Sequence, residues 1–177
     1  MAPKVTVDDL LARNETFALK PPSMPTVADM MEQKLDPAHI VVVSCADPRA
    51  TPEDYFQLKA GEIIVLRNIG GRTIPALEHI LVLDSFVHVS DIIVVHHTDC
   101  GATHVTEAQV RSDLKKRLPH DDNIEKMQFG EIRDLKQSLR DDLSFLKLSP
   151  YIREELKPRV RGFLYDIKSG SMEELKT

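Results

Sequence analysis

Cysteine and long apolar segments are both scarce in this 177-residue sequence, which has two cysteines and no run near the ~18 apolar residues that span a bilayer. Two cysteines exclude a disulfide framework, and a reducing compartment keeps both thiols available as metal ligands or nucleophiles. The segment 1–17 carries acidic residues early and lacks the apolar centre of a signal peptide. We therefore expect a cytoplasmic protein that does not associate with a membrane.

Positive charge is lacking as well. The formal net charge is −5, and the KKR tripeptide at 115–117 is a small basic spot that we interpret as a solvated helix face. These features argue against nucleic acid as a partner. The 42% hydrophobic and 29% charged content, without any internal repeat or linker, fits one compact domain over 1–177.

Hydrophobic patterns predict alternating strands and helices. Short apolar runs at 39–45, 62–68 and 91–97 are typical of buried parallel strands, and the spacing over 74–88 predicts a helix. Strand–helix–strand units of this length predict an α/β fold with a central, mostly parallel sheet of about four to five strands flanked by helices.

Within this single domain we expect three parts. These are a helical amino-terminal arm at 1–35, a core at 39–118, and helices with a closing strand at 119–177. In the arm, Thr6 and Thr26 are cap-type residues that open two helices.

The carboxy-terminal part combines a helical stripe with a strand. The stripe is expected to pack against the core. It comprises Ile132, Leu135, Leu139, Leu143 and Leu146. A strand is expected over 160–167, followed by a turn at Ser169–Gly170, and it adds an edge to the sheet.

Two predicted strands end in residues with metal-binding chemistry. The first ends in Cys45, followed by Asp47 and Arg49, and the third ends in His97, followed by Cys100. If these strands are neighbours, their carboxyl ends bring the two thiols and the imidazole together. Two sulfurs and one nitrogen suit Zn²⁺ and leave its fourth position open. Asp47 and Arg49 can form a charge-assisted pair that keeps the carboxylate ionised beside the metal.

Other interpretations of these motifs remain open. A buried cysteine is commonly a small core residue. Zinc with Asp47 as a permanent fourth ligand would make the chain a non-catalytic zinc-binding module. Cys45 or Cys100 could instead be a redox or nucleophilic thiol, and His97 could activate Cys100, although no CxxC motif is present.

Three segments together resemble one enzyme family. They are CADPR at 45–49, GEIIVLRNIGG at 61–71 and IIVVHHTDCGA at 92–102, and the tail GFLYDIKSG is similar to the family's closing strand. The chain thus resembles the β-class carbonic anhydrases, in the compact HHTDCG subgroup that also includes carbonyl sulfide hydrolases. The resemblance implies a zinc-site core at 39–118 and a homodimer or higher homo-oligomer whose first helix embraces the partner.

The resemblance also assigns roles to site residues. It implies that Cys45, His97 and Cys100 bind zinc and that Asp47 and Arg49 form a catalytic dyad.

Other groups near these motifs are weaker candidates. Gly70 and Gly71 would let the backbone pass close to the site, and Gly101 could present amides to a bound anion, so all three are candidate substrate-binding residues. His96 and His104 are candidate proton shuttles because imidazole titrates near neutrality.

The expected reaction is attack by zinc-bound hydroxide on a small linear substrate. Hydration of carbon dioxide to bicarbonate is the first candidate, and hydrolysis of carbonyl sulfide to hydrogen sulfide and carbon dioxide is the second. One departure bears on this choice. Larger relatives have a substrate-holding glutamine where this chain has Asp36, and Gln33 is out of register.

Overall fold

The computed structural model describes residues 4–176. The chain divides into two compact units, Met1–Pro37 and Ala38–Thr177. The single-domain assignment with its three parts stays a prediction. No helix within the described residues is both long and apolar enough to cross a membrane.

The amino-terminal unit contains helices α1 (Val7–Ala18) and α2 (Val27–Gln33). Each begins after a threonine whose hydroxyl accepts a hydrogen bond from the backbone amide of an aspartate three residues later. The carboxylate of that aspartate accepts a hydrogen bond from the backbone amide of the threonine. The pairs are Thr6–Asp9 and Thr26–Asp29. Both predicted helices are therefore confirmed. No side chain of either helix is buried.

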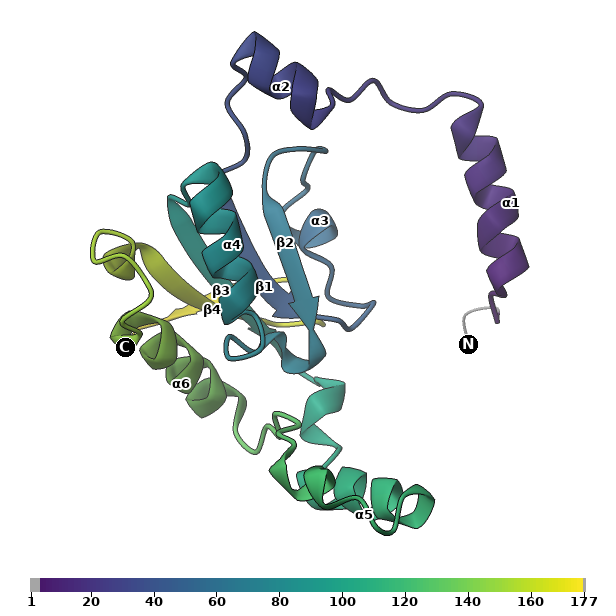
Figure 1. The fold of residues 1–177 in the computed structure, drawn as a ribbon, viewed down its shortest axis with the longest axis vertical. Helices are drawn as coiled ribbons and strands as arrows, with labels where there is room; N and C mark the ends of the chain where they lie inside the picture. Colours follow the sequence, from purple (N-terminus) through teal and green to yellow (C-terminus); the bar gives the residue numbers. More distant parts are fainter. Residues whose placement is uncertain (1–3, 177) are drawn as a thin grey trace. The chain divides into compact units, whose positions relative to one another are not determined.

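The second unit is built around one five-stranded sheet in the order β2-β1-β3-β4-β5 (Figure 1). Its strands are β1 (Ile40–Cys45), β2 (Ile64–Asn68), β3 (Asp91–His97), β4 (Val160–Tyr165) and β5 (Met172–Leu175). The first four are parallel, and β5 runs antiparallel to β4. This arrangement confirms the predicted α/β fold, and it makes β1 and β3 direct neighbours.

Two helices, α4 (Leu77–Val87) and α6 (Leu135–Leu148), pack on one face of this sheet (Figure 1). Most of the predicted stripe is buried: Leu139, Leu143 and Leu146 on α6 are fully inaccessible, Leu135 is half-buried, and Ile132 is buried just before the helix begins. The remaining helical elements are short or peripheral. They are α3 (Pro52–Tyr55), α5 (Glu107–Arg117) and 3-10 turns at Ile69–Gly71, Gly101–Thr103, Asp122–Lys126 and Lys157–Arg159.

Some element boundaries differ from the sequence prediction. The helix expected from residue 74 begins at Leu77, because the Ala76 amide closes a turn onto the Thr73 carbonyl. The strand expected from residue 62 begins at Ile64, because the Glu62 amide closes a turn onto the Lys59 carbonyl. The predicted turn at Ser169–Gly170 is present, but its second strand, β5, was not assigned from the sequence.

Candidate metal centre

The two cysteines and His97 converge where β1 and β3 end. Cys45 is the last residue of β1, His97 is the last of β3, and Cys100 follows three residues later. The two Sγ atoms are 3.7 Å apart, and all three candidate ligand atoms lie within 4.8 Å of one another. All three residues are buried. Because β1 and β3 are neighbours, the thiol at the end of β1 lies beside the imidazole at the end of β3 and the thiol in the turn that follows β3.

This geometry fits a tetrahedral zinc site. Two sulfurs bonded to zinc at about 2.3 Å lie about 3.8 Å apart at the tetrahedral angle, close to the spacing of Cys45 and Cys100. The His97 Nδ1 atom is 2.9 Å from the Thr98 carbonyl oxygen, so Nδ1–H donates there and leaves the Nε2 lone pair free. Nε2 is buried and has no hydrogen-bond partner within residues 4–176. An orphaned acceptor beside two thiols is the arrangement that a metal ion satisfies.

One of the three groups gives up its proton readily. Contact with Cys100 lowers the pKa of Cys45 well below its ordinary value, and the same contact with Cys45 raises the pKa of Cys100. Burial lowers the pKa of His97, but its contacts with Cys45 and the Thr98 carbonyl outweigh this and raise it overall. The pocket thus holds one thiolate readily, and a divalent cation would displace the proton of the second thiol.

Arg49 holds two carboxylates beside these ligands. Its Nε and NH2 groups donate to the two oxygens of Asp47, at 3.0 and 2.8 Å. Its NH1 group donates to Asp99 Oδ2 at 2.8 Å, and NH2 donates to the Asp99 carbonyl at 2.9 Å. The guanidinium is therefore fixed between the end of β1 and the loop that carries Cys100.

Asp47 borders the three ligand atoms. Its side chain is 10% exposed, and Oδ2 lies 3.8 Å from His97 Nε2. Hydrogen bonds from Arg49 lower the pKa of Asp47 to about 2, so the carboxylate is ionised at neutral pH. Such a group can only accept hydrogen bonds.

The loop after β2 passes tightly against the strand ends. Gly70 and Gly71 are buried and have φ angles of 76° and 67°. A Cβ at Gly71 would lie 2.8 Å from the Val95 carbonyl oxygen and 3.0 Å from the Cys45 nitrogen. At Gly101, by contrast, no atom lies within 4 Å of such a Cβ. The substrate-binding roles of the three glycines stay predictions.

The two candidate proton shuttles lie in different environments. His104 is exposed and caps the Gly101–Thr103 turn. His96 is 1% exposed, and its Nε2 lies 3.2 Å from Asp142 Oδ2 on α6. Since successive strand side chains point to opposite faces, His96 faces α6 while His97 does not. Their shuttle roles stay predictions.

Three contributors to the site were missed in the sequence. Arg67 donates to the Cys45 and Asp47 carbonyls at 3.0 and 2.7 Å, and so anchors the loop that carries both residues. Asp99 holds Arg49. Asp142 contacts His96. Of the three, only Asp142 could have been identified from the sequence, because it is a charged residue on the buried side of a helix.

The chain is similar in sequence and in fold to proteins of known family. A family model described as carbonic anhydrase matches residues 40–172. The chain is 27% identical over 143 residues to "Beta-carbonic anhydrase 1" of Mycobacterium bovis, covering 77% of this chain and 82% of that protein. A carbonic anhydrase structure from Streptococcus mutans has a TM-score of 0.78 at 29% identity, covering 98% and 100% of the two chains. A carbon disulfide hydrolase shares the fold, with a TM-score of 0.68 at 22% identity and coverage of 94% and 88%.

Proposed function

The chain belongs to the β-class carbonic anhydrase family, and from this premise we propose that it catalyses the reversible hydration of carbon dioxide to bicarbonate. The observation that carries the proposal is the convergence of Cys45, His97 and Cys100 beside a carboxylate that Arg49 holds in place. When bound by these ligands, Zn²⁺ acts as a Lewis acid that lowers the pKa of a water molecule towards about 7, although thiolate ligands oppose this more than imidazoles do.

Asp47 is suited to orient the attacking water. As an ionised carboxylate it accepts an O–H of the water, which leaves an oxygen lone pair free to face the substrate carbon. Arg49 prevents the carboxylate from rotating, because its two parallel N–H groups engage both oxygens. Since both oxygens are engaged in this way, we propose that Asp47 would not act as a fourth zinc ligand and would leave that position open to water.

A mainly apolar cavity of about 420 Å³ is lined in part by Gly101, which directly follows the candidate ligand Cys100. Its apolar side chains are Ile69, Ala102, Val105, Val110 and Phe129, and Glu107 and Glu131 also border it. A small uncharged gas can enter such a space without losing strong hydrogen bonds to water, whereas the anionic product is better solvated outside. This asymmetry favours entry of the gas and departure of bicarbonate.

Carbonyl sulfide is the second candidate substrate. It has the same linear shape as carbon dioxide, and the apolar cavity suits its greater hydrophobicity. The carbon disulfide hydrolase that shares this fold is named for a substrate of related shape. Asp36 stands where larger relatives have a substrate-holding glutamine, so this chain must orient its substrate with other groups.

Kinetics on both gases test these proposals. The purified protein should contain about one zinc per chain and hydrate carbon dioxide in a stopped-flow assay. Cys45→Ser should lose both metal and activity, whereas Asp47→Asn should keep the metal and lose at least about tenfold in kcat/KM. Asp113→Asn is the control, because it removes an exposed carboxylate that pairs with Lys116 on α5. Zinc-loaded protein active only on carbonyl sulfide would contradict the first proposal, and inactivity on both gases would contradict both.

Assembly and location complete the proposal. We propose a homodimer, because α1 presents an apolar stripe with no buried side chain. We also propose a cytoplasmic location, where both ligand thiols would remain reduced.

A further inference from the structure

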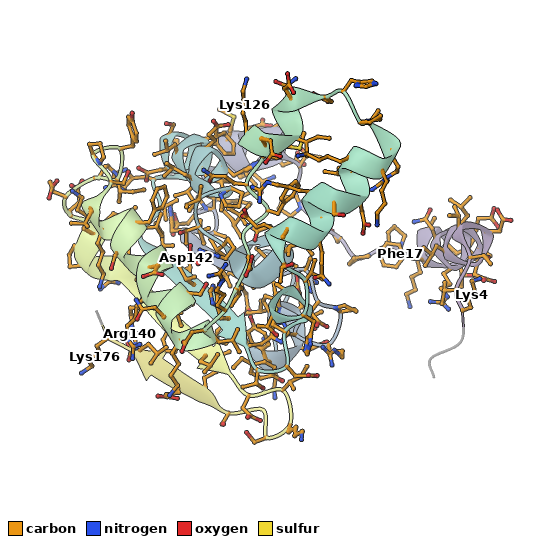
Figure 2. All side chains as sticks on the ribbon, turned by 90° about the horizontal axis from the view of Figure 1, so that it is seen from below. Lys4, Phe17, Lys126, Arg140, Asp142 and Lys176 are labelled. Carbon is orange, nitrogen blue, oxygen red and sulfur yellow. The ribbon has the colours of Figure 1, made fainter. Side chains whose placement is uncertain are left out.

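Asp142 is a buried carboxylate that the proposed reaction does not use. It lies on α6 (Figure 2), where Leu139, Leu143 and Leu146 are also buried. Its side chain is 1% exposed. Burial raises the pKa of Asp142, but the adjacent His96 imidazole and hydrogen bonds from Thr73 outweigh burial and leave it below its ordinary value. A buried negative charge of this kind is costly unless donors surround it. The donors that surround this carboxylate therefore show which parts of the fold it holds together.

The donors come from two segments remote from α6. Asp142 Oδ1 accepts the Thr73 amide at 3.0 Å and the Thr73 hydroxyl at 2.7 Å. Oδ2 accepts Arg72 Nε–H at 2.7 Å and lies 3.2 Å from His96 Nε2. Both carboxylate oxygens are thus occupied by groups that face them from other elements.

Each of these segments adjoins a zinc ligand. Arg72 and Thr73 directly follow Gly71, which lies so near β1 that an added Cβ would be 3.0 Å from the nitrogen of Cys45. Arg72 is also tied to Asn68 by two hydrogen bonds of 2.7 and 2.8 Å, and Asn68 is the register partner of Cys45.

His96 makes the second connection, because it directly precedes His97 on β3. The Asp142 carboxylate therefore ties α6 both to the loop behind Cys45 and to the strand residue beside His97.

We propose that Asp142 is a positioning residue of the metal centre: by anchoring Arg72, Thr73 and His96, it fixes the spacing between the Cys45 and His97 ligands. The inference rests on the zinc site of the proposed function. It assigns no contact with substrate to Asp142. In the Asp142→Asn variant an NH₂ group would replace one acceptor and face the N–H donors of Arg72 or Thr73, so the anchor would be lost without a change in side-chain volume.

The rate of zinc release distinguishes a residue that positions the metal ligands from one that only stabilises the fold. We expect Asp142→Asn to release zinc to a chelating dye at least about tenfold faster than wild type, as variants that disturb partners of metal ligands do. The matched control is Asp84→Asn, which breaks another carboxylate–guanidinium pair, in which Arg153 donates to both oxygens at 2.8 Å. This control should lower the melting temperature and leave zinc release unchanged. Equal release rates for the two variants would overturn the proposal.

A second pair keeps the proposal testable if Asp142→Asn does not fold. Thr73→Val removes the hydroxyl donor to Asp142, whereas Thr73→Ser retains it. Faster zinc release from the valine variant alone supports the proposal, and equal release from both overturns it. Wild-type protein that binds zinc but turns over neither gas would contradict only the proposed function. Wild-type protein that binds no zinc would contradict both.

Discussion

Arg49 does more at this site than neutralise one carboxylate. Its guanidinium joins Asp47 to Asp99, so that the orientation of the Asp47 carboxylate depends on a residue in the loop between two candidate ligands. The planar fork of arginine is needed for this, because a lysine ammonium cannot donate two parallel hydrogen bonds to one carboxylate. Asp99 contributes both its side chain and its carbonyl oxygen.

We therefore expect Arg49→Lys to lower kcat/KM at least about tenfold while zinc content stays at the wild-type level. Asp99→Asn should lower it less than about threefold, because the carbonyl contact remains and the side chain, 59% exposed, is strongly screened. Steady-state kinetics with metal analysis on both variants would check this order. A larger loss for Asp99→Asn than for Arg49→Lys would contradict it.

The loop after β2 shows how backbone packing shapes the site at the scale of elements. Gly71 has a positive φ, and a Cβ added there would meet backbone atoms of both β1 and β3, which cannot move aside as a side-chain tip can. A side chain at this position would push the loop away from the strand ends that carry the ligands.

Gly71→Ala should consequently destabilise the fold by more than about 2 kcal/mol and reduce zinc retention. Gly101→Ala is the matched control, because its new methyl group would meet no atom within 4 Å. Thermal unfolding and metal analysis of the two variants provide the measurement. Similar melting temperatures for the two variants would contradict the prediction, because they would show that the loop can shift to accommodate a methyl group at position 71.

The regular elements could be predicted from sequence where their signals are local. β3 has the predicted bounds of 91–97, and the threonine caps Thr6 and Thr26 mark the starts of their helices. β5 could not be predicted, because two of its four residues are glutamates and it becomes a strand only by pairing with β4. Its stability comes from its partner rather than from its own composition.

The same distinction applies to the candidate site. Cys45, His97 and Cys100 could be predicted because each stands at or just after the end of an apolar strand. The residues that hold the site depend on contacts between remote segments, which periodicity does not reveal. Arg67 reaches a carbonyl 22 positions away, Asp99 meets a guanidinium 50 positions away, and Asp142 meets one 70 positions away.

At the scale of the whole molecule, the Asp84–Arg153 pair links stability to pH. Hydrogen bonds from Arg153 lower the pKa of Asp84 in the folded protein. A carboxylate with a lowered folded pKa stabilises the fold above its unfolded pKa of about 4, and this contribution is lost as pH falls through the folded value. The pair is 15% and 25% exposed, so solvent screens it in part.

We expect wild type to exceed Asp84→Asn in stability by about 1 kcal/mol at neutral pH. The difference should shrink below about pH 4, where the carboxyl group takes up a proton. Chemical unfolding of both proteins across this range measures it, and comparing the two cancels effects that they share, such as metal loss in acid. A constant difference down to about pH 3 would contradict the assignment.

Assembly is the second prediction at this scale. Leu10 and Phe17 lie seven residues apart, on one side of α1, and are 53% and 57% exposed. If this stripe packs on a partner, wild type should have twice the chain mass of 20.0 kDa by light scattering, and Leu10→Asp should shift it towards the monomer. Ala12→Asp, which adds the same charge on the other side of α1, should not. A monomeric wild type would refute the expectation.

The two edges of the sheet differ in their capacity to accept another strand. On β5, Glu173 and Glu174 are exposed and pair with Lys136 and Arg161, and such charges discourage further pairing. β2, at the opposite edge, begins with the apolar run 64–66. If two chains paired through β2, the outer edges of the joined sheet would both be the charged β5, so association along this direction would end in a closed pair and would not propagate into a filament.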